Sequence, residues 1–199
     1  MFYHAADVPR DIASQLWSAV ISPRPVFLVA SKSEDLQSNI AAFSSIGLIS
    51  IYPPIISISF GKRRSGPKFT LQNILATRHF SLNGVPRELA ETANKSAEGL
   101  ERADDFRRLG LTAGSFDRSP ASAIIEAPLS IACELLQTVE IMDSPCTLIL
   151  ARCRELIVCD RYVQHGLFDP IAANLVGSTG LEDFITVRGE SFALPRTWE

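Results

Sequence analysis

Apolar residues in the first third of the chain alternate with small or polar residues at the spacing of β-strands. Three segments, residues 25–31, 39–50 and 55–60, show this pattern, and polar or proline-bearing stretches separate them. The adjacent prolines Pro53 and Pro54 enforce a break before the third segment, because proline cannot donate a hydrogen bond within a central strand ladder. The pattern therefore predicts three strands joined by turns.

Beyond residue 65 the apolar spacing becomes that of a helix. Residues 68–78 carry apolar side chains at helical intervals, which predicts a helix over this segment. Ser65 or Gly66 would cap it, and Pro67 would lie in its first turn, where the missing N–H costs no helical hydrogen bond.

The rest of the chain predicts further strands and short helices. A strand is expected at residues 79–85, two short exposed helices at 86–97 and 100–110, and two long strands at 129–142 and 147–159. This order lacks the regular strand-helix-strand rhythm of a parallel sheet. We expect a mainly β, antiparallel barrel with short inserted helices. No repeat or long linker divides the chain, so residues 1–199 should form a single domain.

Composition and charge exclude several classes of function. The chain has 199 residues, of which 46% are hydrophobic and 21% are charged, as in ordinary globular domains. Its net charge of −3 gives no overall attraction for nucleic acid, and only one compact basic loop is present. No apolar run approaches the roughly 20 residues needed to span a bilayer, and no signal peptide begins the chain. We therefore expect a cytoplasmic protein with no nucleic-acid or membrane partner.

The cysteines and histidines do not form a recognisable catalytic or metal motif. The four cysteines, Cys133, Cys146, Cys153 and Cys159, match neither a CxxC nor a zinc pattern. Buried or half-buried thiols on strands are expected, without a disulfide framework. His4, His79 and His165 are expected to be packed or surface residues, because nothing nearby marks a catalytic pair.

A basic loop at residues 61–70, GKRRSGPKFT, is the strongest candidate for binding chemistry. Lys62, Arg63, Arg64 and Lys68 crowd a glycine-bearing loop that opens a helix, and Thr70 adds a hydroxyl. The N–H groups and dipole at a helix start favour a phosphate, and cationic side chains add charge-assisted hydrogen bonds. The same run could equally be a solvated basic loop. It contains neither GxxxxGK[ST] nor GxGxxG, so classical nucleotide folds are not indicated.

A second candidate is the segment NIAAFSS, residues 39–45. Its small residues would let a flat ring approach the backbone, and Asn39, Ser44 and Ser45 could present donors and acceptors to the edge of the ring. Taken alone, the segment could also be an ordinary barrel strand.

The order of these motifs resembles the flavin-reductase-like proteins of the FMN-binding split-barrel superfamily, particularly a flavoredoxin-like branch with an SPRP opening. The shared features are SPRP before the first barrel strand, N-x-A-x-F-S on the second, PP before the third, a basic loop with K-x-T, and a helix followed by a strand with Asn. The resemblance covers roughly residues 20–160. The tail departs from the pattern, since residues 175–180 lack the arginine and tyrosine that relatives carry there, which places in doubt any pocket contact in that segment.

The resemblance implies a six-stranded Greek-key split barrel, usually a homodimer, with FMN at the subunit interface. By position in the motifs, the ring and ribityl chain would contact Asn39, Ala41, Ala42, Ser44 and Ser45. The ribityl end and phosphate would contact Ser59, Lys62, Arg63, Lys68 and Thr70, and Asn83 would begin a loop near the same site. Arg24 of SPRP would bind an anionic group or form a salt bridge at the end of the barrel.

The implied activity is NAD(P)H-dependent flavin reduction, in which a hydride passes from the nicotinamide to flavin N5. The cofactor would carry this chemistry, so no catalytic side chain and no metal are assigned. Two alternatives keep the same fold: a flavin carrier or electron-transfer protein, and a reductase component that releases reduced FMN to a monooxygenase. The sequence does not distinguish NADH from NADPH or identify the acceptor.

Overall fold

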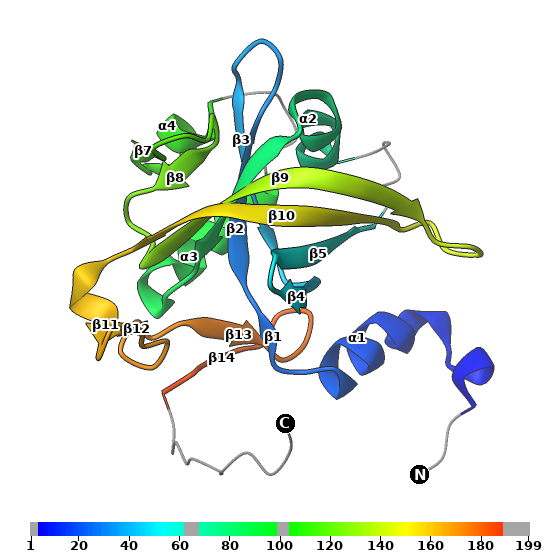
Figure 1. Ribbon diagram of the computed structural model, residues 1–199. Coiled ribbons are helices and arrows are strands. Elements are labelled where there is room, and N and C mark those ends of the chain that lie inside the picture. The colour runs from blue at the N-terminus through cyan, green and yellow to red at the C-terminus, as the bar shows by residue number, and fades with distance from the viewer. Residues whose placement is uncertain (1–3, 62–67, 99–103, 189–199) are drawn as a thin grey trace.

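The computed structural model describes residues 4–61, 68–98 and 104–188, and its centre is a curled antiparallel sheet (Figure 1). In space the strands follow the order β3-β2-β6-β9-β10-β5-β4, and every neighbouring pair is antiparallel. Their bounds are β2 Phe27–Lys32, β3 Ser38–Phe43, β4 Ile46–Ile51, β5 Pro54–Phe60, β6 His79–Gly84, β9 Leu129–Glu140 and β10 Thr147–Val158. The predicted antiparallel, mainly β fold is confirmed.

One bent segment joins the two ends of this sheet. β3 pairs with β2, the chain bends at Ser44 and Ser45, and β4 then pairs with β5. At the bend, the Ser59 N–H donates to the Ser45 carbonyl at 3.0 Å. The prediction of a single strand over 39–50 was therefore wrong, because the segment serves two different neighbours. Counted as one bent segment, β3 and β4 give the six strands of the predicted barrel.

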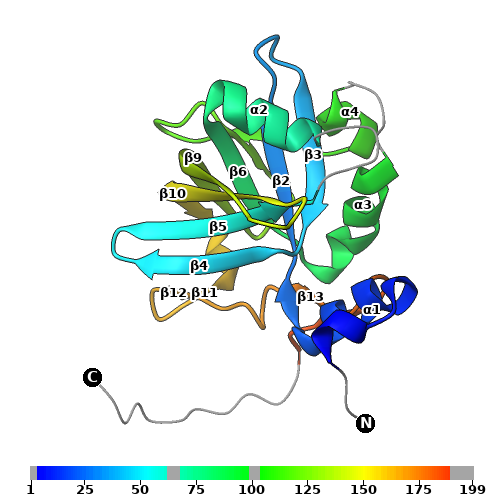
Figure 2. The ribbon, with the colours of Figure 1, turned by 90° about the vertical axis from the view of Figure 1, so that its right-hand side faces the viewer.

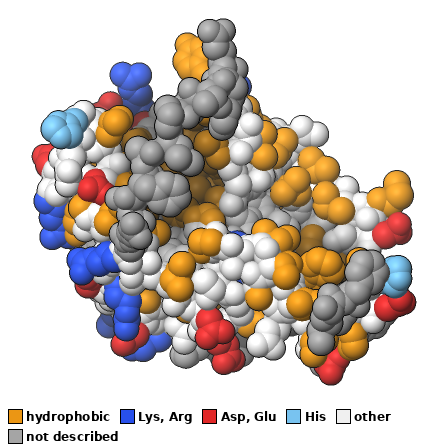
Figure 3. Space-filling view, turned by 90° about the horizontal axis from the view of Figure 1, so that it is seen from below, with side chains coloured by type: hydrophobic (Ala, Val, Ile, Leu, Met, Phe, Trp, Pro, Cys, Tyr) orange, Lys and Arg blue, Asp and Glu red, His pale blue; other side chains and the backbone are white. Residues whose placement is uncertain are grey.

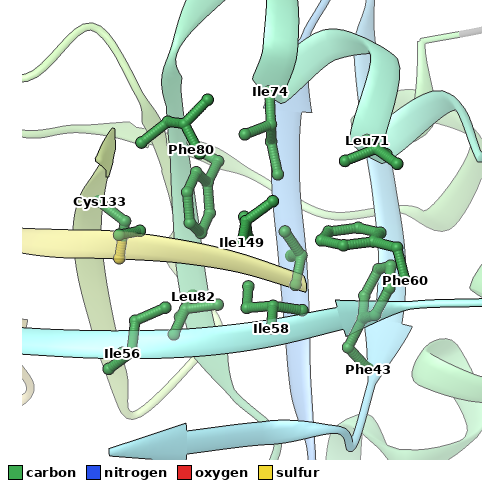
Figure 4. Close-up of a cluster of buried hydrophobic side chains, with 13 residues drawn as sticks. Phe43, Ile56, Ile58, Phe60, Leu71, Ile74, Phe80, Leu82, Cys133 and Ile149 are labelled. Carbon is green, nitrogen blue, oxygen red and sulfur yellow. The ribbon is translucent and has the colours of Figure 1, made fainter. Parts of the chain in front are cut away.

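The barrel interior is filled by apolar side chains that alternate along its strands. Phe43, Ile58, Phe60 and Ile149 are buried near its centre, and Cys133 lies at the opposite end of the cluster from Phe43 (Figure 4). Alternation is the consequence of strand geometry, in which successive side chains point to opposite faces.

Helix α2, Phe69–Thr77, closes one end of the barrel and lies within the predicted range 68–78. Its buried Leu71 and Ile74 belong to the barrel cluster. The helix has Lys68 at its N-cap, whereas the expected caps Ser65 and Gly66 lie outside the described residues. It ends at Arg78, which adopts a left-handed conformation with φ of 64° and donates its N–H to Ile74.

A helical insertion covers the outer face and free edge of β3 (Figure 2). It comprises η2 Arg87–Leu89, α3 Ala90–Lys95, η3 Ser96–Glu98, α4 Asp105–Leu109 and the small strands β7 Ala113–Ser115 and β8 Ser122–Ile124. A second apolar cluster, which includes Leu28, Ile40 and Phe106, lies beneath it. The sheet is thus buried on both faces in this region.

Side chains of the insertion satisfy the main-chain donors on the free edge of β3. The Ile40 N–H donates to Asp105 Oδ2 at 2.8 Å, and the Ala42 N–H donates to Ser96 Oγ at 3.0 Å. Arg108 Nε in turn lies 2.7 Å from Asp105 Oδ1. Asp105 and Phe106 are buried, whereas Arg107 and Arg108 are exposed, so the expected exposed helix over 100–110 holds for only one face of the part described. One charged residue of this helix, Asp105, thus caps the edge of a strand.

Segments from the early and late parts of the described chain pair below the barrel, where a three-stranded sheet has the order β1-β13-β14 (Figure 1). Apart from Pro25, at which the first predicted strand begins, the sequence predicted none of these strands. Their bounds, with those of the remaining short elements, are η1 Ala5–Asp7, α1 Arg10–Val20, β1 Arg24–Pro25, η4 Asp160–Tyr162, β11 Val163–Gln164, β12 Leu167–Phe168, β13 Val176–Ser178 and β14 Phe184–Thr186.

The four cysteines are free thiols, as predicted. Cys133 on β9 is buried and Cys153 on β10 is half-buried. Cys146 and Cys159 are also half-buried, but each lies just outside β10, so the expectation of a strand position holds for only two of the four.

Apolar side chains are also present on the surface. Seen from below, they spread over much of the face, while charged side chains lie mainly toward its rim (Figure 3). On α1, Trp17 is 46% exposed. None of the helices in the described ranges combines the length and hydropathy needed to cross a bilayer.

We predict that Asp105→Ala lowers the free energy of unfolding by about 1.5–3 kcal/mol, because it removes charge-assisted hydrogen bonds and leaves the buried Ile40 N–H without a partner. Urea unfolding measures this change. Asp117→Ala is the matched control, since the Asp117 side chain is 85% exposed, and it should alter stability by no more than about 0.5 kcal/mol. Equal losses in the two variants would refute the capping role of Asp105.

Candidate functional site

The predicted binding residues 39–45 lie along β3, whose first residues contact the start of α2, and at the bend that follows the strand. Near the start of the strand, Asn39 Nδ2 donates to Thr70 Oγ1 at 2.8 Å. Thr70 is 1% exposed and lies in the first turn of α2. This hydrogen bond fixes the start of the helix against the barrel strand, so two residues that the sequence assigned separately form one contact.

Lys68 lies beside the same strand. Its Nζ stands 4.7 Å from the centroid of the Phe43 ring, and the Phe43 and Phe60 rings meet edge to face at 4.9 Å. The ammonium group is thereby held at the start of α2, where the helix dipole also favours anions. Lys62 and Arg63 lie outside the described residues.

At the bend the chain offers small, polar side chains. Ser44 is half-buried and Ser45 is exposed, and the main chain of Ser59 holds the bend through its hydrogen bond to Ser45. Ala41 packs against the barrel cluster, whereas Ala42 packs against the cluster under the insertion. The side chains of the two alanines therefore lie on opposite faces of β3.

A hollow of ≈ 220 Å³ lies beside this bend. Three predicted residues line it, namely Arg24, Ala42 and Ser44. The sequence missed the other lining residues, which are Ser18, Val26, Phe43, Ser178, Gly180, Leu181 and Phe184. Of the described residues that line it, Arg24 is the sole ionisable one. The lining is therefore suited to bind and position a ligand and offers no side chain suited to act as a general base.

Arg24 lines this hollow, and not all of its guanidinium N–H groups have hydrogen-bond partners among the described residues. Its Nη2 donates to Ser178 Oγ at 3.0 Å and to the Gly180 carbonyl at 3.1 Å. Its Nε is buried and has no hydrogen-bond partner among the described residues. Within those residues Arg24 forms no salt bridge either, so its charge is not neutralised by a carboxylate there. Arg24 is half-buried, and a guanidinium with no carboxylate partner among the described residues fits an electronegative ligand atom.

The tail segment reaches the site even though its sequence departs from the expected pattern. Arg24 pairs with Ser178 in the β1–β13 ladder. A Cβ on Gly177 would lie 3.0 Å from Pro23 Cβ, so the SPRP segment packs against a position that favours glycine. Ser178 and Gly180 line the hollow, so the segment 175–180 lies at the candidate site although its sequence departs from the expected pattern.

Asn83 occupies a different part of the fold. The side chain is fully buried, and its Nδ2 donates to the Leu28 carbonyl and to Ser81 Oγ. Its Oδ1 accepts from the Ile124 N–H and from the Ser130 hydroxyl. These four bonds use the full capacity of an amide side chain. Asn83 thus ties β2, β6, β8 and β9 together, and the geometry gives no support for a ligand contact by this side chain.

Two larger hollows occur in the described structure. One, of ≈ 830 Å³, lies between α3 and β14, and it shares Leu181 and Phe184 with the hollow at the bend. Arg87 and Lys95 line it, together with Glu91 of α3 and with Glu182 and Asp183, which precede β14. The other, of ≈ 430 Å³, lies by the β2–β3 turn and contains none of the predicted site residues. Among the described residues, no group of three or more His, Cys, Asp or Glu side chains could hold a metal ion.

Comparisons with known proteins match most of this chain to one family. The family described as flavin reductase-like domain matches residues 20–168. An uncharacterised protein of Deinococcus radiodurans is 29% identical over 95% of this chain and 86% of its own length, and one of Aquifex aeolicus is 31% identical over 72% and 74%.

Solved structures with low sequence identity show the same fold. Nitrilotriacetate monooxygenase component B from Bacillus cereus has a TM-score of 0.89 at 21% identity and covers 98% of each chain. A protein with a split barrel domain from Shewanella frigidimarina has a TM-score of 0.85 at 20% identity, over 97% of this chain and 96% of that one. An FMN-binding protein from Thermus thermophilus has a TM-score of 0.70 at 18% identity, over 88% and 93%.

Proposed function

The chain belongs to the flavin reductase-like family, and from this premise we propose that it is an FMN-binding oxidoreductase that passes hydride from NAD(P)H to the flavin. The observation that carries the proposal is the hollow at the bend after β3, where the half-buried guanidinium of Arg24, with no carboxylate partner among the described residues, shares the lining with small side chains. The cytoplasmic location expected from the sequence is part of the same proposal.

The residues of the hollow suit a flat, electron-rich ring. Ala42, Ser44 and Gly180 have little side-chain bulk, so a ring can lie close to the main chain. Arg24 is the sole cation on this wall within the described residues, and its half-buried guanidinium can donate to the edge of the ring that gains negative charge on reduction. Asn39 at the start of β3 and Ser45 just beyond its end extend the proposed seat, whereas Ala41, whose side chain packs against the barrel cluster, would contribute its main chain.

The start of α2 suits the phosphate of FMN. Lys68 and Thr70 are brought together there, and Asn39 fixes Thr70 against β3. Ser59, Lys62 and Arg63 complete the proposed ribityl and phosphate contacts. A terminal phosphate at this position explains a preference for FMN, because a helix start and a cation bind a monoester dianion well.

When bound, FMN supplies hydride acceptance at N5. The chain's own residues then have three tasks: to hold the ring, to hold the phosphate and to position the nicotinamide for transfer. The ≈ 830 Å³ groove that shares Leu181 and Phe184 with the flavin seat is the proposed entrance for NAD(P)H. Arg87 and Lys95 on its wall can contact anionic groups of a dinucleotide.

A homodimer with FMN at the interface is the proposed assembly. A hollow of ≈ 220 Å³ is smaller than the about 300–1,000 Å³ typical of ligand pockets, so one chain alone encloses only part of a flavin. Next to the bend, β4 exposes Leu48, Ile49 and Ile51, and Tyr52, which follows the strand, is 96% exposed. An apolar edge strand of this kind is typical of an interaction surface.

The experiment that tests the function combines binding with turnover. We expect purified protein to bind FMN with at least about tenfold higher affinity than riboflavin, since riboflavin lacks the phosphate and its charge-assisted contacts. We also expect the FMN complex to oxidise NADH or NADPH under single-turnover conditions. Tight FMN binding with no nicotinamide oxidation would indicate a flavin carrier, and no flavin binding would refute the whole proposal.

Lys68→Ala tests the phosphate contact. The substitution should weaken FMN binding about tenfold to a hundredfold, equivalent to about 1.5–3 kcal/mol, and leave riboflavin binding nearly unchanged. Lys32→Ala is the control, because Lys32 lies at the far end of β2 beside the ≈ 430 Å³ hollow. Affinities are measured at fixed ionic strength by fluorescence titration. An equal loss for both flavins would mean that Lys68 supports the ring site or the fold instead.

Ile51→Asp tests the assembly. Light scattering should give a dimer mass for the native protein and a monomer mass for the variant, whose FMN affinity should fall because half of the seat is lost. Ile51 is 77% exposed in the single chain, so the folded monomer tolerates the charge. Leu36→Asp, equally exposed at the β2–β3 turn, should remain dimeric. A native monomer that binds FMN tightly would contradict the proposed interface.

A further inference from the structure

Cys133 and Cys153 lie directly opposite each other in the β9–β10 ladder. Cys133 is a member of the barrel cluster, and Cys153 packs against that cluster, so both side chains point toward the barrel interior. Immediately after this pair the register shifts, because β10 carries one extra residue between Cys153 and Glu155. Such bulges bend a strand locally and often adjoin functional positions.

Cys133 and Cys153 form the type of antiparallel cross-strand pair, the non-hydrogen-bonded pair, in which the two side chains come closest. The Leu135 N–H donates at 2.8 Å to the Arg78 carbonyl, which precedes β6, so this side of β9 faces β6. Main-chain groups two residues apart on a strand point in the same direction, so those of Cys133 also face β6. Cys133 and Cys153 therefore form a non-hydrogen-bonded pair, whose Cα atoms are typically about 4.5 Å apart. A disulfide accepts Cα separations of about 4.4–6.8 Å.

The two thiols differ in exposure and in acidity. Hydrogen bonding to Cys153 and burial both raise the pKa of the Cys133 thiol. The hydrogen bond from Cys133 lowers the pKa of Cys153, which is half-buried and therefore accessible to a small oxidant. A thiolate is the nucleophilic form of cysteine, so Cys153 is the reactive member and Cys133 the protected one.

We propose that Cys133 and Cys153 form a redox-active dithiol that hydroperoxides convert to an intramolecular disulfide. The Cys153 thiolate attacks one oxygen of hydrogen peroxide, breaks the O–O bond and becomes a sulfenic acid while hydroxide leaves. The Cys133 sulfur then attacks the Cys153 sulfur, the S–O bond breaks, and the oxygen leaves as water with the thiol proton. Overall the two thiols lose two electrons and two protons, and a thiol reductant restores them.

The other two cysteines lack this arrangement. Cys146 lies in the turn before β10, and Cys159 follows the end of that strand, so neither has a cysteine as its cross-strand partner. Cys133 also lies at the far end of the barrel cluster from Phe43, which lines the proposed flavin seat (Figure 4). The dithiol chemistry is therefore independent of flavin binding, and either proposal can fail without the other.

The experiment treats the full chain with limiting hydrogen peroxide, blocks the remaining thiols by alkylation and maps the peptides by mass spectrometry. Trypsin isolates Cys153 between two arginines, and Glu-C cleavage after Glu134 separates Cys133 from Cys146. We expect one intramolecular disulfide that joins Cys133 to Cys153, lowers the intact mass by two hydrogen atoms and disappears with dithiothreitol. Cys146 and Cys159 should remain alkylated.

Three variants make the assignment specific. Cys133→Ala, an apolar change that suits the buried position, should let dimedone trap a sulfenic acid on Cys153. Cys153→Ser should abolish the disulfide, and the double variant Cys146→Ser/Cys159→Ser should form it as the native chain does. The proposal is overturned if peroxide leaves the pair alkylatable while other thiols oxidise. A disulfide that includes Cys146 or Cys159, or that links two chains, would overturn it as well.

Discussion

The hydrogen bonds that Asp105 and Ser96 accept from the edge of β3 hold together the part of the structure on which the candidate site depends. An edge strand must pair, be covered or face water, and here two side chains of the insertion take the place of a neighbouring strand. Because side chains satisfy the free edge of β3, this strand needs no second neighbouring strand, and the chain can bend away from β2 at Ser44 and Ser45. The same segment can then pair with β5 and close the barrel.

The bend that closes the barrel also creates the proposed seat for the flavin. The residues at the bend are not covered by a paired strand, so their main chain and small side chains can contact a ligand. Arg24 and the tail approach this bend from below, and α2 begins beside the same strand. A ring at the bend and a phosphate at the helix start would thus be held by elements far apart in sequence but anchored to a single strand.

The sequence predicted those features that local pattern determines. Alternating apolar residues indicated β2, β5, β6, β9 and β10, and helical spacing indicated α2. No proline or glycine marks the bend at Ser44 and Ser45 within the predicted strand 39–50. The bend arises because the two halves of the segment pair with different strands, β2 and β5. Local pattern could not reveal it.

Contacts over long sequence separations explain the remaining errors. Arg24 meets Ser178 across 154 positions, and no local signal marks either residue as a partner. Asn83 looked like a loop residue near a ligand, yet its amide is saturated by four internal bonds that become visible only in three dimensions. Asp105 looked like a charge on an exposed helix, and its burial follows from the unpaired edge of β3. In each case a tertiary hydrogen bond determined the role.

The central claim is that flavin binds along β3 and that the tail forms part of the seat. Hydrogen–deuterium exchange with and without FMN tests it most directly, since it reports protection segment by segment. We expect FMN to slow exchange over residues 39–45 and 176–186 and to leave residues 117–122, beside the ≈ 430 Å³ hollow, unchanged. Protection confined to 117–122, with no change along β3 and the tail, would contradict the account.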